Sequence, residues 1–158
     1  MSVEEAQEVL LIEEQGLAAV RQRIGTEFLK AVELIHHCPS RLIITGIGKS
    51  GIIGQKITAT LNSTGTPSFF LHPVEAMHGD LGILRKGDVM LALSFSGESE
   101  ELLGLVPIAR RVGVQVVAMT QSRENALADL SDEVLVMPIE REACPFNMAP
   151  TTSTTSVF

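Results

Sequence analysis

The chain has 158 residues, of which 45% are hydrophobic and 20% are charged. That length suits one domain with a single core, and the composition excludes an intrinsically disordered chain. Lysine and arginine together number 12 and aspartate and glutamate 19, which gives a net charge of −7. Because Trp and Tyr are also absent, the sequence argues against nucleic-acid binding and against binding to an anionic membrane.

The two cysteines, Cys38 and Cys144, are too few for a disulfide framework. No apolar stretch approaches the roughly 18 residues that a membrane helix needs. The acidic N-terminus also differs from the basic start of a signal peptide. We therefore expect a soluble, cytoplasmic protein with no membrane partner.

Residues 3–37 carry a helical pattern and form the expected N-terminal extension, residues 1–37. The pair Gly25-Thr26 divides it into two helices, with Thr26 as the N-cap of the second. Apolar residues recur every seven positions along one stripe: Leu10, Leu17, Ile24 and Ala31, with Phe28, Val32 and Ile35 beside them.

After residue 37 the hydropathy pattern changes to short apolar runs that are typical of strands: 41–46, 67–72, 88–94, 114–120 and 133–139. Helices are expected between them at 50–64, at about 99–112 and near 123–130. Strands that are apolar on both faces and alternate with helices predict a parallel sheet covered on both sides. The expected fold class is α/β, a three-layer α/β/α sandwich with a five-stranded parallel sheet over residues 38–158. Ligands then bind beyond the carboxyl ends of the strands.

A glycine-rich turn follows the first strand. The dinucleotide-binding pattern G-x-G-x-x-G fits residues 46–51, but no acid follows the second strand until Glu75. A Walker A loop fails because its first glycine would fall on Ile43. The turn can still present backbone N–H groups and the charge of Lys49 to an anion. The alternative is a tight turn with a solvated lysine.

A serine-rich loop follows the third strand, with Ser94, Ser96, Gly97 and Ser99 at the start of a helix. Three hydroxyls and a glycine there favour a cradle for a phosphate monoester. The alternative is ordinary capping by Ser96 or Ser99. The acids after the loop, Glu98, Glu100 and Glu101, suit the helix dipole, and at most one of them is expected to be catalytic.

Two histidines, His72 and His78, follow the second strand and are candidate acid–base groups near neutral pH. They have no third metal ligand at convincing spacing. After the fifth strand come Glu142 and Cys144. No activating pair accompanies the cysteine, which favours a partly buried thiol over a nucleophile.

Four segments in this order resemble the sugar isomerase (SIS) domain, and within it the arabinose 5-phosphate isomerase (KpsF/GutQ-like) branch. They are GIGKSG (46–51), STGTPSFFLHPVEAMHGDLG (63–82), SFSGESEEL (94–102) and EREACPFNMAPTTSTT (140–155). The resemblance implies a tetramer with active sites at subunit contacts and no cofactor. It also implies reversible conversion of D-ribulose 5-phosphate and D-arabinose 5-phosphate, which feeds synthesis of 3-deoxy-D-manno-octulosonate (Kdo) for lipopolysaccharide or capsule.

The same resemblance implies catalytic roles for Lys49, Glu101 and Glu142. Its substrate-binding segments match Gly65, Thr66, His72, His78, residues 104–113 and 138–140. The position of His72 is also where zinc binds in the family, as an inhibitor. Two departures are visible: the pair of CBS domains that often follows is not in this sequence, and a further catalytic histidine would lie beyond Phe158.

Together these observations assign the phosphate to Ser94, Ser96, Gly97 and Ser99, helped by residues 48–51, which include Gly48 and Ser50. Lys49 stabilises developing negative charge, and Glu101, Glu142 and His78 are the acid–base candidates. The alternatives are a non-catalytic sugar-phosphate sensor, an SIS isomerase for another ketose phosphate, and a nucleotide-dependent oxidoreductase, which the missing acid disfavours.

The segment 149–156 is read either as a flexible tail or as the start of a helix with one hydroxyl as N-cap. The resemblance favours the helix. On that reading we expect these 158 residues to bind pentose phosphate, to isomerise it slowly or not at all, and to self-associate.

Overall fold

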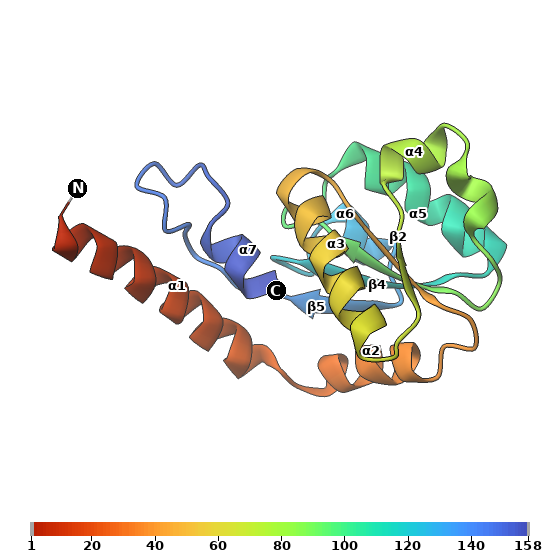
Figure 1. Cartoon of the computed structure of the whole chain (residues 1–158), viewed down its shortest axis with the longest axis horizontal. Helices are drawn as coiled ribbons and strands as arrows, with labels where there is room; N and C mark the ends of the chain where they lie inside the picture. The colour runs from red at the N-terminus through yellow and green to blue at the C-terminus, as the bar shows by residue number, and fades with distance from the viewer. Residues whose placement is uncertain (1, 158) are drawn as a thin grey trace.

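The computed structural model describes residues 2–157 and is built on a five-stranded sheet (Figure 1). Every strand pairing is parallel and the strand order is β2-β1-β3-β4-β5. This confirms the predicted fold class. The strands are β1 (Leu42–Gly46), β2 (Ser68–Phe70), β3 (Val89–Leu93), β4 (Gln115–Thr120) and β5 (Glu133–Val136).

Helices cover both faces of the sheet, as its apolar strands require. Those after the N-terminal region are α3 (Gly48–Ser63), α4 (Pro73–Met77), the 3-10 helix η1 (Asp80–Ile83), α5 (Glu100–Val112), α6 (Ala126–Asp129) and α7 (Thr152–Val157). The N-terminal region forms α1 (Val3–Arg23) and α2 (Thr26–His36).

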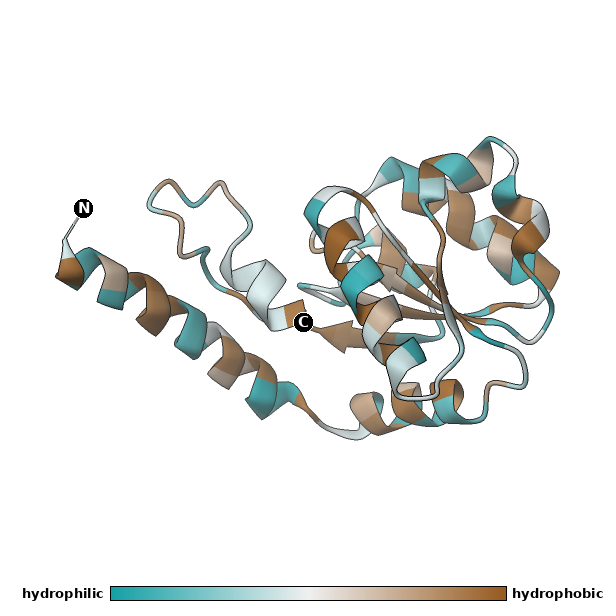
Figure 2. Cartoon of the chain, viewed as in Figure 1, coloured by the Kyte–Doolittle hydropathy of each residue, from teal (hydrophilic) through white to brown (hydrophobic). Residues whose placement is uncertain are grey.

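The core divides into two layers, one on each face of the sheet. Ile43 and Met90 point from β1 and β3 toward the layer that holds Leu105 of α5. Their neighbours Ile44 and Leu91 point to the opposite layer, which α2 and α3 cover. The alternation along each strand follows from the period of two in β-structure. Figure 2 shows the strands as hydrophobic along their length, whereas the helices carry mixed surfaces.

Several predicted boundaries shift. The second strand is only three residues long, and the fifth ends at Val136. Helix α4 and η1 were not predicted, because helices of four or five residues are too short to show a hydrophobic period. The one local signal for α4 is Pro73 at its first turn, a position that proline favours.

The N-terminal region is helical as predicted, but its details differ. Thr26 is not the N-cap of α2: Gly25 takes that position without a side-chain hydrogen bond, and the Thr26 hydroxyl bonds to the Glu27 carboxylate. Within residues 2–157, no helix is long and apolar enough to cross a membrane.

The heptad stripe of the N-terminal region is largely solvent-exposed in the single chain. Helix α1 instead contacts α7, where Gly16 lies against Thr152. A Cβ atom at Gly16 would come within 2.4 Å of the Thr152 Cγ2 atom, so this helix contact needs glycine. The exposed apolar side chains of this stripe are Leu10, Leu17, Ile24, Phe28 and Val32.

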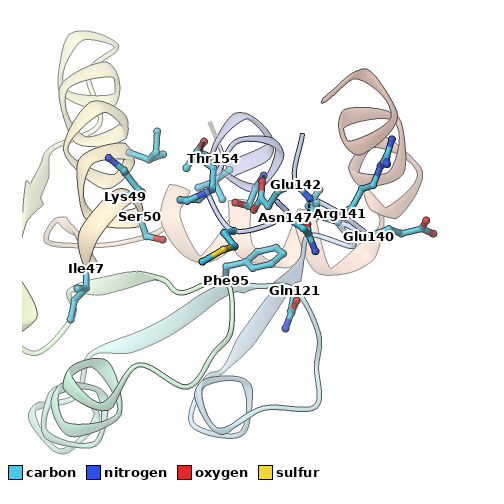
Figure 3. Close-up of a pocket in the computed structure, with 16 residues that line it drawn as sticks. Ile47, Lys49, Ser50, Phe95, Gln121, Glu140, Arg141, Glu142, Asn147 and Thr154 are labelled. Atoms are coloured by element: carbon cyan, nitrogen blue, oxygen red, sulfur yellow. Dashed lines mark hydrogen bonds between the residues drawn. The ribbon is translucent and has the colours of Figure 1, made fainter. Parts of the chain in front are cut away.

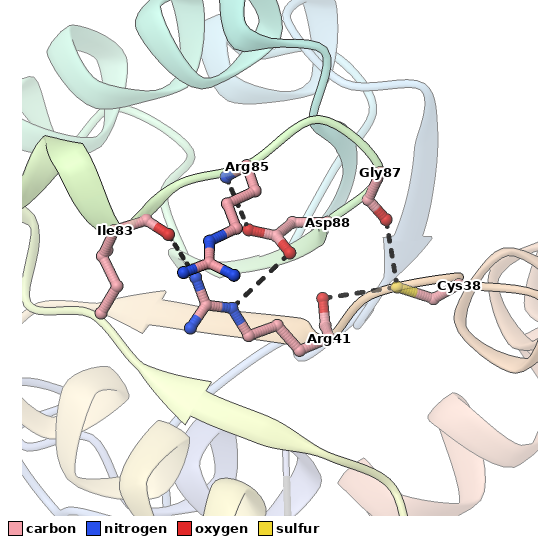
Figure 4. Close-up of polar contacts among 6 residues, drawn as sticks. All are labelled: Cys38, Arg41, Ile83, Arg85, Gly87 and Asp88. Carbon is pink, nitrogen blue, oxygen red and sulfur yellow. Dashed lines mark hydrogen bonds and ion pairs between the residues drawn. The ribbon is translucent and has the colours of Figure 1, made fainter.

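A buried ion pair ties the amino edge of the sheet together (Figure 4). The Asp88 side chain is fully buried, and its Oδ1 atom lies 3.6 Å from Nε of Arg41. The other carboxylate oxygen accepts a 2.9 Å bond from the Arg85 N–H. The Cys38 thiol bonds to the carbonyl oxygens of Arg41 and Gly87. These contacts join the start of β1 to the turn before β3.

We predict that Asp88→Ala lowers the free energy of unfolding by about 3 kcal/mol, because it removes the ion-pair partner of the Arg41 guanidinium and the acceptor of the Arg85 N–H. Asp88→Asn keeps an acceptor for the N–H and is expected to cost less. Urea denaturation measures both. Asp129→Ala, at an exposed position of α6, is the control and should change the free energy by less than about 0.5 kcal/mol. Equal effects at the two aspartates would contradict the structural role of the pair.

Candidate functional site

The strand order places a crevice at the carboxyl edge of the sheet. Strand β1 lies between β2 and β3, so the chain leaves β1 and β3 toward opposite faces, and ligands bind where such connections diverge. A cavity of about 510 Å³ lies at this edge. Segments that follow β1, β3, β4 and β5 line it together with α7 (Figure 3).

The turn after β1 brings Lys49 and Ser50 to the cavity. Helix α3 begins at Gly48, directly after the strand. A Cβ atom on Gly51 would lie 2.7 Å from the Gly46 carbonyl oxygen, so the helix can start this close to the strand only with glycine there. The turn is therefore tight, and it also directs the first turn of α3, with its free N–H groups, at the cavity.

The serine-rich loop is folded back on itself. The hydroxyl groups of Ser94 and Ser99 are 2.9 Å apart, and Ser94 Oγ also accepts from the Gly97 N–H. Ser96 Oγ accepts from the Glu98 N–H. Ser99 is the N-cap of α5, yet its side chain makes no capping bond. Phe95 is the residue of this loop that lines the cavity.

Gly97 fixes the loop against the next connection. Its φ is +72°, and a Cβ atom would lie 2.0 Å from the Asn125 Oδ1 atom. The Asn125 amide in turn bonds to Thr120 Oγ1 and to the Ser122 carbonyl oxygen. A larger residue at Gly97 would push the serine loop away from the sheet edge.

Glu142 is the carboxylate that the fold holds most closely at the cavity. Its Oε2 atom accepts from the Thr151 N–H at 2.7 Å, the Ser153 N–H at 3.1 Å and the Thr151 hydroxyl at 3.2 Å. The Glu142 N–H donates to the Asn147 side chain. The expected helix over the tail is confirmed as α7, but a carboxylate satisfies its first N–H groups, not the hydroxyl N-cap that the sequence suggested.

These contacts set the protonation state of Glu142. Burial raises its pKa, but hydrogen bonds from Ser153 and Thr151 outweigh burial and bring the pKa below the ordinary value of 4.5. The side chain is therefore an ionised acceptor at neutral pH.

Of the two cationic side chains that line the cavity, Arg141 has a carboxylate partner and Lys49 has none among the described residues. Arg141 lies 3.4 Å from Glu8 of α1, and Figure 3 shows it directed toward that helix. Among the described residues, no carboxylate lies within ion-pair distance of Lys49. The lysine is therefore the cation that the cavity offers to a ligand.

The other predicted site residues lie elsewhere in the single chain. Glu101 is exposed in the first turn of α5, and His78 is exposed at the end of α4. Neither lines the cavity with Lys49 and Glu142. Gly65 and Thr66 precede β2 and so lie at its amino end, on the opposite edge from Lys49.

His72, the position at which zinc was expected, is half-buried, and its ring packs edge-on to Phe70 with centroids 6.5 Å apart. Its Nδ1 atom is buried without a hydrogen-bond partner. Over residues 2–157, no group of three or more His, Cys, Asp or Glu side chains is arranged to hold a metal ion. The zinc position at His72 therefore stays a prediction.

Several cavity residues were not predicted. Gln121 follows β4 directly, so the rule that ligands bind beyond strand ends would have found it. Asn147, whose φ of +51° is unusual for a residue other than glycine, had no sequence signal. Cys144 is half-buried as expected, and backbone N–H groups of Ala149 and Met148 are the main cause of its lowered pKa.

We predict that Glu142→Gln destabilises the fold by about 1–3 kcal/mol at neutral pH, the range for hydrogen bonds to a charged group. Because folding lowers the pKa of Glu142, its contribution is fully present above the ordinary value of 4.5 and is lost as pH falls through the folded pKa. Urea denaturation of wild type and variant at several pH values measures this. Glu14→Gln, at an exposed position of α1, is the control. If the difference in free energy of unfolding between wild type and Glu142→Gln did not become smaller at acidic pH, the prediction would be contradicted.

Comparison with known proteins supports the resemblance seen in the sequence. The sequence model of the SIS domain matches residues 34–158. The chain is 46% identical to the arabinose 5-phosphate isomerase KdsD of Pseudomonas aeruginosa, over 97% of this chain and 47% of that protein. It is also 46% identical to the arabinose 5-phosphate isomerase GutQ of Salmonella typhi, over 93% of this chain and 46% of that protein.

Among solved structures, the c3406 protein of E. coli CFT073 in complex with arabinose 5-phosphate superposes with a TM-score of 0.86 and 36% identity. The match covers 99% of this chain and 86% of that one. The chain spans about half the length of the curated relatives it matches. With four-fifths of its length matched by the family's sequence model, the chain belongs to the SIS domain family.

Proposed function

We propose that the protein is an aldose–ketose isomerase that interconverts D-ribulose 5-phosphate and D-arabinose 5-phosphate. The observation that carries the proposal is that Lys49 and Glu142 line one cavity at the carboxyl edge of the sheet, next to the serine loop. The names of the relatives and the arabinose 5-phosphate complex of the E. coli protein support the substrate.

The reaction moves one proton between neighbouring carbons. A base removes a proton from C1 of the ketose, and the C1–H electrons form a C1–C2 double bond while the C2 carbonyl becomes an oxyanion. Return of the proton to C2 and transfer of the O1 hydroxyl proton to the C2 oxyanion give the aldose. Such a step needs an acid–base group and a cation or hydrogen-bond donor at the oxyanion.

The chain offers groups for each task. We assign the phosphate to the serine loop and the free N–H groups at the start of α3, and the developing negative charge to Lys49. A grip on the remote phosphate can then position the reacting carbons. Glu101, Glu142 and His78 are the acid–base candidates, of which Glu142 is the one that lines the cavity.

The proposal includes assembly as a homotetramer with sites at subunit contacts. The separation of Glu101 and His78 from the cavity supports it, since groups from different chains would then complete each site. The exposed apolar side chains of α1 and α2 also support it, because a contiguous apolar face is typical of an interface. The product would feed Kdo synthesis for lipopolysaccharide or capsule, in the cytoplasm.

We predict that Lys49→Gln lowers kcat/KM for D-ribulose 5-phosphate by about 100-fold or more, because it removes the charge that stabilises the oxyanion. Arabinose 5-phosphate formation by the full chain, followed by NMR, measures this. Lys56→Gln is the matched control, since Lys56 is exposed two turns further along the same helix. A fully active Lys49→Gln would contradict the assignment. In a chain that includes the histidine implied beyond Phe158, a wild type that binds the sugar phosphate without converting it would favour a sensor.

We predict that Ser96→Ala weakens binding of arabinose 5-phosphate by about 1–3 kcal/mol, the range for a hydrogen bond to a charged group. Isothermal titration calorimetry measures the change. Ser63→Ala is the control, because Ser63 is exposed at the far end of α3 and bonds only to a backbone carbonyl oxygen of its own helix. Unchanged affinity in a folded Ser96→Ala would remove the serine loop from the phosphate site.

A further inference from the structure

The segment between β5 and α7 is closed by contacts between Glu142 at its start and Thr151 at its end. Thr151 lies nine residues after Glu142, yet the two side chains meet. Thr151 Oγ1 accepts from the Ala143 N–H at 2.9 Å and lies 3.2 Å from Glu142 Oε2. Because the hydroxyl already accepts from an N–H, its single proton is left to donate to the carboxylate. The direction of the bond to Glu142 is thereby fixed.

The three donors all meet Glu142 at the same oxygen. The Thr151 N–H, the Thr151 hydroxyl and the Ser153 N–H each reach Oε2. The Ser153 hydroxyl is a further donor that lowers the pKa of this carboxylate. Oε2 is therefore tied to the chain by three bonds, whereas Oε1 takes part in none of the three and can accept from a ligand in the cavity that Glu142 lines.

Thr151 does not itself line that cavity, whereas its neighbours Pro150 and Ser153 do. Any effect of Thr151 on the reaction must then pass through the residue it holds. We infer that Thr151 is a positioning residue that fixes the Glu142 carboxylate as a hydrogen-bond acceptor for the substrate hydroxyls. The inference rests on the proposed isomerase function.

The same contacts favour the ionised carboxylate, in agreement with the lowered pKa of Glu142. A group held ionised in this way is a weaker proton acceptor than one near neutral pKa. Glu142 is thus suited to orienting the sugar, and the proton between C1 and C2 falls to another acid–base group. Glu142 also lines a second cavity, which lies between α1 and the segment that follows β5. The charged or titratable groups that line either cavity with Glu142 are Lys49, Glu140, Arg141, Cys144, and Glu5 and Glu8 of α1.

The test compares Thr151→Val, which removes the hydroxyl at nearly constant size, with Thr151→Ser, which keeps it. Thr58→Val on α3 is the matched control, because its hydroxyl bonds only to a carbonyl oxygen of its own helix. Carbon-13 NMR of the side-chain carboxyl, assigned with Glu142→Gln, follows the titration of Glu142. Initial rates with D-ribulose 5-phosphate across a pH range give kcat and KM.

We expect Thr151→Val to raise the pKa of Glu142 toward 4.5 and to move the acid limb of the kcat profile to higher pH. It should lower kcat about tenfold or more with KM little changed, since misplacement of a group that orients the substrate can cost up to about 100-fold. Thr151→Ser should restore wild-type values, and Thr58→Val should retain them.

The inference is overturned if Thr151→Val leaves the titration or kcat unchanged, or if Thr151→Ser is equally impaired. If the valine variant does not fold, a wild-type Glu142 that titrates at or above 4.5 overturns it. A wild type without turnover, in a chain that includes the histidine implied beyond Phe158, overturns the proposed function, whatever Thr151 does. An active wild type with an unaltered Thr151→Val overturns only the positioning role.

Discussion

All five strands run in one direction, and that constraint decides where every functional group of this chain lies. Parallel pairing on both sides of β1 brings the carboxyl ends of the strands to one edge. The connections after β1 and β3 diverge there, which opens a crevice without any special loop. Residues far apart in the sequence, such as Lys49 and Glu142, then share a cavity. The segments that precede strands, among them Gly65 and Thr66, are carried to the other edge by the same constraint.

The existence of the main elements followed from the sequence because their signals are local. Apolar runs of Val, Ile and Leu between helical segments indicated the parallel sheet, and glycine at positions 46, 48 and 51 indicated the tight turn after its first strand. The features that the sequence did not show depend on contacts between distant residues, or they are elements too short to display a hydrophobic periodicity. Helix α4, with five residues, is such a short element. Thr26 was a wrong N-cap because its hydroxyl bonds to Glu27.

The candidate site shows the same division. Strand-end reasoning found Lys49 and Glu142, which line one cavity, and it would have found Gln121. It did not find the role of Thr151, because the contact between Thr151 and Glu142 requires the chain to turn back through a loop that contains Asn147 in a left-handed conformation. The three serines correctly indicated a loop at the start of a helix, α5. In the structure, however, the hydroxyl groups of Ser94 and Ser99 bond to each other. A ligand that binds there must compete with that bond.

The way Glu142 is satisfied explains how an acidic protein can offer a cation to an anionic ligand. The chain carries a net charge of −7, so an anionic ligand meets overall repulsion and depends on local charge. If Lys49 formed an ion pair with the Glu142 carboxylate, neither charge would be available to a ligand. Neutral donors from Thr151 and Ser153 hold it in place of a cation, and Arg141 is engaged by Glu8 at the rim. Among the described residues Lys49 is therefore left without a carboxylate partner, while a fixed acceptor faces it across the same cavity, so the anionic group and the hydroxyl groups of one ligand can be bound by different side chains.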